Sequence, residues 1–218
     1  MPVTFPGESP AYRTARDALL TEEIALRAQV ERVAALRRDL PLGGSVADYA
    51  FQELSGETLA LGELFSHPNR TLAIYSLMFR PDQNAPCPMC TSMLDGLAGQ
   101  AQHIAQHMDF VVVAAAKPEQ LRALSDDRGW GALRLLSTDG STYQTDYGAE
   151  APDGSQLPMM NVFSQTENGV RHFWGSEMFH AGLDGHPRHV DQLWPLWNML
   201  DLTPAGRPDW FPALDYNN

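Results

Sequence analysis

The two cysteines of this 218-residue chain, Cys87 and Cys90, are separated by two residues. This spacing allows the two sulfur atoms to form a disulfide or to share a metal ion. Pro88 directly follows Cys87, and proline is favoured at the first position of a helix. The residue before a proline is driven toward extended backbone angles, which are those of a helix N-cap. Because a helix N-terminus favours negative charge, the sequence predicts that Cys87 has a lowered pKa and attacks as a thiolate.

The segments around this Cys-Pro-Met-Cys stretch, hereafter the CPMC motif (residues 87–90), predict a βαβ unit. Thr71–Phe79 has the continuous apolar character of a central strand, and Phe110–Ala115 has it again. Pro88–His107, between them, has an apolar stripe at helical spacing. In a parallel βαβ unit the CPMC motif lies at the carboxyl end of the first strand. Open α/β sheets place their reactive groups at that edge.

Further helices and strands are expected on both sides of this unit. Apolar periodicity and turn residues predict a helix over Ser9–Leu40, a β-hairpin over Tyr49–Leu61, a helix over Pro118–Arg128, a strand over Leu133–Ser137, a second hairpin over Met159–Trp174 and a final helix over His189–Leu200. The sequence therefore predicts an α/β fold with a central mixed sheet flanked by helices. We divide the chain into an N-terminal helical extension at residues 1–44, a main domain at 45–202 and a C-terminal tail at 203–218 packed on that domain.

The charge of the chain argues against two classes of partner. The formal net charge is −12, whereas nucleic acids and anionic membranes are bound by clustered lysine and arginine. No apolar run reaches the length of a membrane span, and the first residues resemble neither a signal peptide nor a lipidation signal. We therefore expect a cytoplasmic protein with neither nucleic acid nor membrane as a partner.

A metal site is the competing interpretation of the motif. Cys87, Cys90, His103 and His107 have the spacing of a Cys2His2 zinc finger. If residues 88–107 form one helix, however, Cys87 and His103 are about 24 Å apart, because an α-helix rises about 1.5 Å per residue. We therefore expect no metal ligand set and no cofactor.

The order of the predicted elements resembles the thioredoxin-like fold, in which a hairpin and an apolar strand precede a Cys-x-x-Cys helix. A strand and a helix follow, and then a proline, here Pro158, enters a β-hairpin. More narrowly, nearly the whole chain resembles a family of uncharacterised bacterial thioredoxin-like proteins, defined as a domain of unknown function. The residues that carry this resemblance are Met78-Phe79-Arg80-Pro81 with the CPMC motif, Gly129-Trp130, Asp146-Tyr147-Gly148 and Leu200–Arg207.

The resemblance implies a thiol-disulfide oxidoreductase that acts on a protein or small-molecule disulfide. It makes Cys87 the attacking thiolate, Cys90 the resolving thiol and Pro158 a cis-proline that faces them. The chain also departs from a typical thioredoxin. Pro86 stands where a thioredoxin has tryptophan, and the strand Thr71–Phe79 lacks the buried acid that assists proton transfer.

Three alternatives remain open. The first is a redox-inert thioredoxin-like protein with a binding or assembly role. The second is a thiol peroxidase in which Cys87 attacks a peroxide, although the chain lacks the threonine that peroxiredoxins place before the nucleophile. The third is the Cys2His2 zinc site.

The helix over Ser9–Leu40 is expected to pack on its own domain or to form a homodimer, since its apolar residues recur at steps of three, four and seven.

Overall fold

The computed structural model describes residues 3–176, 193–206 and 212–215. It divides into two compact units, residues 1–41 and residues 42–218. The start of the predicted final helix, residues 189–192, lies outside the described residues. Among the described helices, none combines the length and the apolar character needed to cross a membrane.

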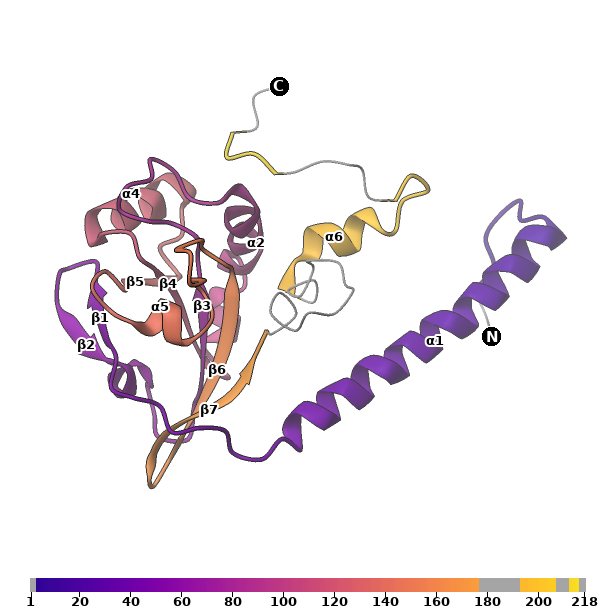
Figure 1. Cartoon of the computed structure of the whole chain (residues 1–218). Coiled ribbons are helices and arrows are strands. Elements are labelled where there is room, and N and C mark those ends of the chain that lie inside the picture. Colours follow the sequence, from indigo (N-terminus) through magenta and orange to yellow (C-terminus); the bar gives the residue numbers. More distant parts are fainter. Residues whose placement is uncertain (1–2, 177–192, 207–211, 216–218) are drawn as a thin grey trace. The chain divides into compact units, whose positions relative to one another are not determined.

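The first unit consists of one long helix and the short segment before it (Figure 1). Helix α1 spans Pro10–Arg38, and Ser9 is its N-cap, with the Ser9 hydroxyl accepting a hydrogen bond from the Tyr12 N–H. Pro10 occupies the first helical position, where its missing N–H costs no hydrogen bond. The predicted N-terminal helix is therefore confirmed, with its end two residues earlier than expected.

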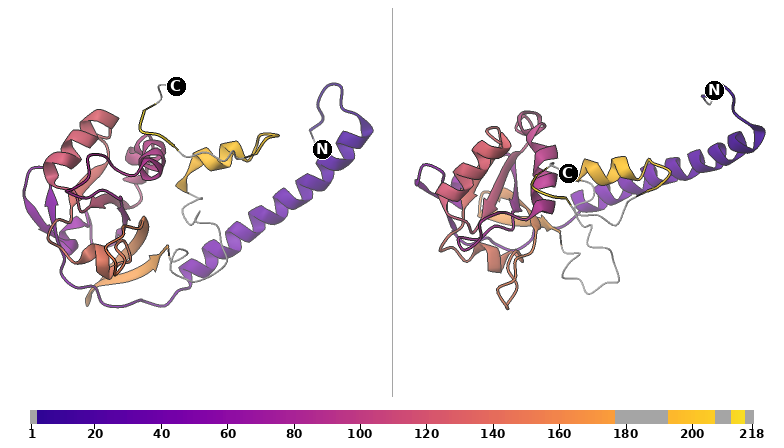
Figure 2. Two further views of the ribbon diagram at one scale, coloured as in Figure 1. Left: turned by 45° about the horizontal axis from the view of Figure 1, so that its top comes forward. Right: turned by 90° about the horizontal axis from the view of Figure 1, so that it is seen from above.

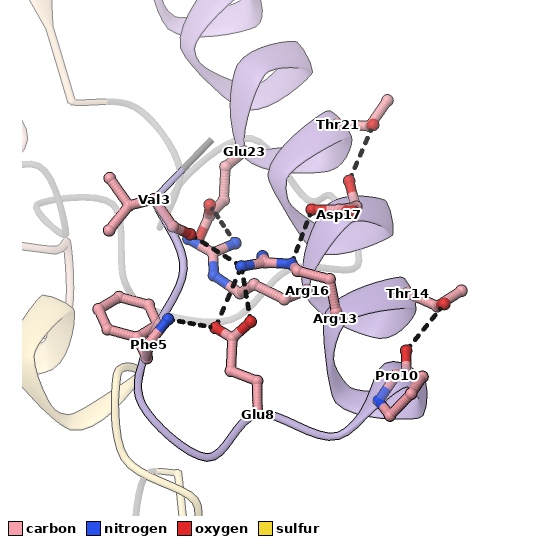
Figure 3. Close-up of polar contacts among 10 residues, drawn as sticks. All are labelled: Val3, Phe5, Glu8, Pro10, Arg13, Thr14, Arg16, Asp17, Thr21 and Glu23. Carbon is pink, nitrogen blue, oxygen red and sulfur yellow. Dashed lines mark hydrogen bonds and ion pairs between the residues drawn. The ribbon is translucent and has the colours of Figure 1, made fainter. Parts of the chain in front are cut away.

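Arg13 fixes the segment before α1 onto the first turns of that helix (Figure 3). Its guanidinium donates to the Val3 carbonyl at 2.8 Å, and it forms ion pairs with Glu8 and Asp17, each at 3.1 Å. Glu8 also accepts a hydrogen bond from the Phe5 N–H at 2.9 Å. Surface ion pairs of this kind each contribute about 0–1 kcal/mol, so the network orders the segment more than it stabilises the chain.

The second unit is built on a curled mixed sheet of seven strands in the order β2-β1-β5-β4-β3-β6-β7 (Figure 1). The strands are β1 Ala50–Glu53, β2 Thr58–Ala60, β3 Thr71–Ser76, β4 Asp109–Ala114, β5 Arg134–Ser137, β6 Met159–Thr166 and β7 Gly169–Gly175. Strands β3, β4 and β5 are parallel, whereas β6 runs antiparallel to β3. Both predicted hairpins and the predicted parallel βαβ unit are present.

Helices cover the two faces of this sheet (Figure 2). They are the 3-10 helix η1 Leu61–Leu64 and the α-helices α2 Pro88–Ala98, α3 Ala101–Ile104, α4 Pro118–Arg128, α5 Tyr143–Asp146 and α6 Pro195–Leu200. Residues of α2, α3, α4 and α6 share one core cluster with the sheet, whereas η1 and Tyr143 of α5 belong to the cluster on the other face.

Alternation along β3 sends successive side chains into the two cores. Ala73 and Tyr75 belong to the core shared with α2, and Leu72 and Ile74 to the core shared with η1. All four are buried, which explains why the strand reads as a continuous apolar run instead of an alternating one. Since burying a large aliphatic side chain contributes about 1.5–3 kcal/mol, β3 is fixed in register from both sides.

The expectation of one helix over Pro88–His107 was wrong. Helix α2 ends at Ala98, and a short α3 follows over Ala101–Ile104. The Gln100 N–H bonds to the Leu97 carbonyl, three residues back, which tightens the chain into a turn at this point. Gly99 lies at the break, and glycine costs about 0.8–1.0 kcal/mol relative to alanine inside a helix. The short helix α5 was not predicted either, because its sequence has no clear apolar period.

Candidate functional site

The CPMC motif forms the start of α2, as the sequence predicts. Cys87 is the N-cap with extended backbone angles, φ −60° and ψ 123°, and Pro88 occupies the first turn. The Cys87 N–H bonds to the Met78 carbonyl at 3.0 Å, which joins the motif to the segment after β3. The Cys87 carbonyl accepts bonds from both the backbone N–H and the hydroxyl of Thr91, each at 3.0 Å. Both ends of Cys87 are therefore held by the backbone.

The two thiols are free but occupy different environments. Cys87 is half-buried, and its pKa is lowered from 9.0 to about 6. The main cause is a hydrogen bond from Cys90. Bonds from the backbone at Cys90 and Met89 add to it, and burial opposes them. Cys90 is only 3% exposed, and its interaction with Cys87 together with burial raises the pKa of Cys90 well above its usual value. The pair therefore consists of one accessible thiolate and one buried thiol.

Tyr75 is a third member of the site that the sequence did not reveal. It lies on β3, is 1% exposed and forms a hydrogen bond with the Cys90 side chain. Burial, followed by the nearby cysteines, raises the pKa of Tyr75 well above 10, so its hydroxyl keeps its proton. The available signal was the one tyrosine in an otherwise largely apolar strand, since buried tyrosine hydroxyls usually have a hydrogen-bond partner.

Arg80 organises the loop that leads into the motif. The Arg80 guanidinium donates to the Gly154 carbonyl at 2.9 Å, and the Arg80 backbone N–H donates to the side-chain oxygen of Gln83 at 2.8 Å. Gln120 of α4 donates to the Gln83 carbonyl at 3.1 Å. A cavity of about 480 Å³ lies beside this loop, lined by residues 83–86, by α4 and by Leu214 and Asp215 of the tail. The chain thus leaves open space next to the residue that precedes Cys87.

Pro158 lies at the same edge of the sheet as the motif. Met159, the next residue, pairs with Ser76, the last residue of β3. No peptide bond among the described residues is cis, so the Leu157–Pro158 bond is trans. This corrects the cis-proline that the resemblance implied. The trans form of an X–Pro bond is lower in free energy by about 0.5–1 kcal/mol, and β6 pairs with β3 from its first residue without a cis bond.

The alternative zinc ligands, the two cysteines with His103 and His107, do not form a metal-binding cluster. His103 lies on α3 and His107 in the turn after it. In the described part of the chain, no three His, Cys, Asp or Glu side chains are placed to hold one metal ion. The separation of about 24 Å expected for one continuous helix does not apply, because α2 ends at Ala98 and α3 starts at Ala101. The separation of these histidines from the cysteines comes instead from two helices and a turn.

The sheet order, the parallel β3-α2-β4 unit and the paired cysteines at the start of α2 define a thioredoxin-fold protein. The crystal structure of peroxidoxin BcpB from Mycobacterium tuberculosis is similar to it, with a TM-score of 0.50, 17% identity and coverage of 72% of this chain and 95% of that one. The chain itself belongs to a family described as bacterial protein of unknown function (DUF899), whose model matches residues 2–216.

Two more solved structures are similar at lower scores. Peroxiredoxin Q from Xanthomonas campestris has a TM-score of 0.47, 14% identity and coverage of 74% of this chain and 98% of that one. The exposed lipoprotein thioredoxin of Streptococcus pneumoniae has a TM-score of 0.44, 12% identity and coverage of 69% and 99%. No curated protein matches the chain in sequence. At such identities the likeness to solved structures establishes the fold alone.

Proposed function

We propose that the protein is a thiol-disulfide oxidoreductase. The observation that carries this proposal is the unequal pair at the start of α2, where Cys87 has a pKa of about 6 and Cys90 keeps its proton. The thiolate is the nucleophile in disulfide exchange, so Cys87 is largely in its reactive form at neutral pH. The buried Cys90 is held nearby for a second step.

The reaction has two exchange steps. The Cys87 thiolate attacks one sulfur of the substrate disulfide, a mixed disulfide forms, and the other substrate sulfur leaves as a thiolate. Cys90 then loses its proton and attacks the Cys87 sulfur. The bond between Cys87 and the substrate breaks, the second substrate thiolate leaves, and a Cys87–Cys90 disulfide remains. The substrate disulfide is reduced by two electrons and the cysteine pair is oxidised by two.

The substrate in this proposal is a disulfide in a protein or a small molecule. The cavity beside residues 83–86 supports this assignment, because Pro86, the residue before Cys87, lines it and a group attached to the substrate could occupy it. A cytoplasmic location belongs to the same proposal, since a reducing compartment would maintain the dithiol form. Pro158, at the same sheet edge, is proposed to face the bound substrate through its backbone.

The test is to trap the mixed disulfide with glutathione disulfide. In Cys90→Ser, Cys87 should keep one glutathione, detected by intact mass, because the resolving thiol is absent. The reduced wild-type chain should release both glutathiones and form an internal disulfide. Cys87→Ser is the matched control and should stay unmodified at neutral pH. No adduct in Cys90→Ser, or an equal adduct in Cys87→Ser, contradicts the proposal.

The same variant separates the peroxidase alternative. Cys90→Ser should react with hydrogen peroxide no faster than an ordinary exposed thiolate of similar pKa, because oxidation of cysteine follows thiolate character and exposure. Reaction with peroxide that is much faster than that of such an ordinary thiolate would instead identify a thiol peroxidase. A chain that reacts with neither compound would be the redox-inert binding protein.

A further inference from the structure

Tyr75 is the next-to-last residue of β3, near the end of the strand that leads to the CPMC motif. It pairs with Val112 of β4 on one side and with Met160 of β6 on the other, so its backbone cannot shift without breaking two ladders. Its side chain shares one core cluster with Cys90. A buried hydroxyl without a hydrogen-bond partner is destabilising, and here the partner is the Cys90 side chain.

We propose that the Tyr75 hydroxyl donates a hydrogen bond to the sulfur of Cys90 and stabilises the Cys90 thiolate as it resolves the mixed disulfide. This inference rests on the proposed function and assigns the group that assists its second step. Tyr75 thereby lies on the strand that carries a buried acid in a typical thioredoxin and that contains no acid in this chain. A phenol that keeps its proton acts differently from a carboxylate, because it donates to the sulfur and does not take the proton from it.

The charges around Cys90 change between the two steps. In the dithiol form, the Cys87 thiolate and burial raise the pKa of Cys90, whereas Tyr75 and the backbone at Met78 lower it. Once Cys87 is bound to substrate it carries no charge, so the largest contribution that raises the pKa of Cys90 is lost. Cys90 can then release its proton to water or to the departing substrate thiolate. The Tyr75 hydroxyl and the backbone at Met78 remain to stabilise the new negative charge.

Tyr75→Phe tests this role, because it removes only the hydroxyl. The experiment mixes the reduced full chain with glutathione disulfide and follows both steps by rapid acid quench and intact mass. Formation of the mixed disulfide at Cys87 should stay within about twofold. Resolution at pH 7 should slow by at least about tenfold, since hydrogen bonds to charged groups contribute about 1.5–3 kcal/mol. The pH of half-maximal resolution should rise.

Tyr143→Phe is the matched control. Tyr143 is 0% exposed and belongs to the core on the opposite face of the sheet. This variant also loses one buried tyrosine hydroxyl, so any general effect of loosening a core should appear in it as well. Both steps and the pH profile should match those of the wild-type chain.

Other outcomes would overturn the inference. An unchanged resolution rate and pH profile in Tyr75→Phe would show that the hydroxyl plays no part, and equal slowing of both steps would show a structural role only. If Tyr75→Phe does not fold, 3-fluorotyrosine at position 75 supplies a stronger donor and must speed resolution; an unchanged rate contradicts the proposal. Failure of the proposed function is a separate result, because Cys90→Ser would then form no mixed disulfide at all.

Discussion

At the scale of the residue, the site depends on giving two identical side chains opposite properties. Cys87 is at the N-cap, where backbone N–H groups and the Cys90 thiol stabilise its negative charge. Cys90, one helical turn later, lies in the core and lacks water to stabilise a charge of its own. The two thiols thus share one proton, and the proton stays on the buried sulfur. Position on the helix decides which cysteine attacks.

The hydrogen bond from Cys90 is the main cause of the lowered pKa of Cys87, which makes a direct prediction. Cys90→Ala removes the donor and should raise the pKa of Cys87 toward that of an ordinary cysteine thiol. Cys90→Ser keeps a hydroxyl donor at the same place and should raise it less. The rate of iodoacetamide alkylation as a function of pH measures both values. A Cys87 pKa in Cys90→Ala equal to that of the wild-type chain would show that the helix N-terminus, and not the Cys90 thiol, lowers the pKa.

At the scale of the element, β6 and β7 approach closely at Gly175. A methyl group added there would lie 2.9 Å from the Asn161 Oδ1 and 3.4 Å from the His172 Nε2. Those two atoms are themselves 3.0 Å apart and join the strands, while the Asn161 amide donates to the Tyr147 carbonyl at 3.1 Å. The absence of a side chain at Gly175 therefore allows a buried polar link beside the β6 strand that follows Pro158.

Gly175→Ala should lower the free energy of unfolding by about 1–3 kcal/mol, because the new methyl group must displace Asn161 or bend β7. Urea denaturation of the reduced chain measures this change. Gly62→Ala is the control, since no atom lies within 4 Å of its added methyl group and its φ is not positive. That variant should change the free energy of unfolding by less than about 1 kcal/mol. Equal losses in the two variants would contradict the packing argument.

At the scale of the whole molecule, the sequence predicts the sheet better than the details of the site. Thr71–Phe79 and Phe110–Ala115 are apolar enough to identify central strands, and Pro88 identifies the start of α2. The break after Ala98 was missed because the apolar stripe continues across Gly99. The partner of Tyr75 was missed because a hydrogen bond between neighbours in space leaves no local pattern. The trans bond before Pro158 was missed because the cis form was inferred only from the resemblance to the thioredoxin-like fold.

The N-terminal helix carries charge of opposite sign to the rest of the chain. From Pro10 to Arg38 it has six arginines and four acidic residues, a net charge of +2, although the whole chain has −12. Several of its large apolar side chains are exposed, among them Ile24, Leu26 and Val30. The homodimer expected through this helix stays a prediction. The redox chemistry proposed for residues 42–218 does not depend on it.

The most direct test of the account is a pH titration of Cys87 in the reduced full-length chain. The thiolate absorbance near 240 nm, after subtraction of the absorbance of Cys87→Ser, should rise with increasing pH and have its midpoint at about pH 6. The rate of mixed-disulfide formation with glutathione disulfide should follow the same curve. A midpoint at or above about 8.5, the value of an ordinary cysteine thiol, would contradict the claim that the start of α2 prepares Cys87 to attack disulfides.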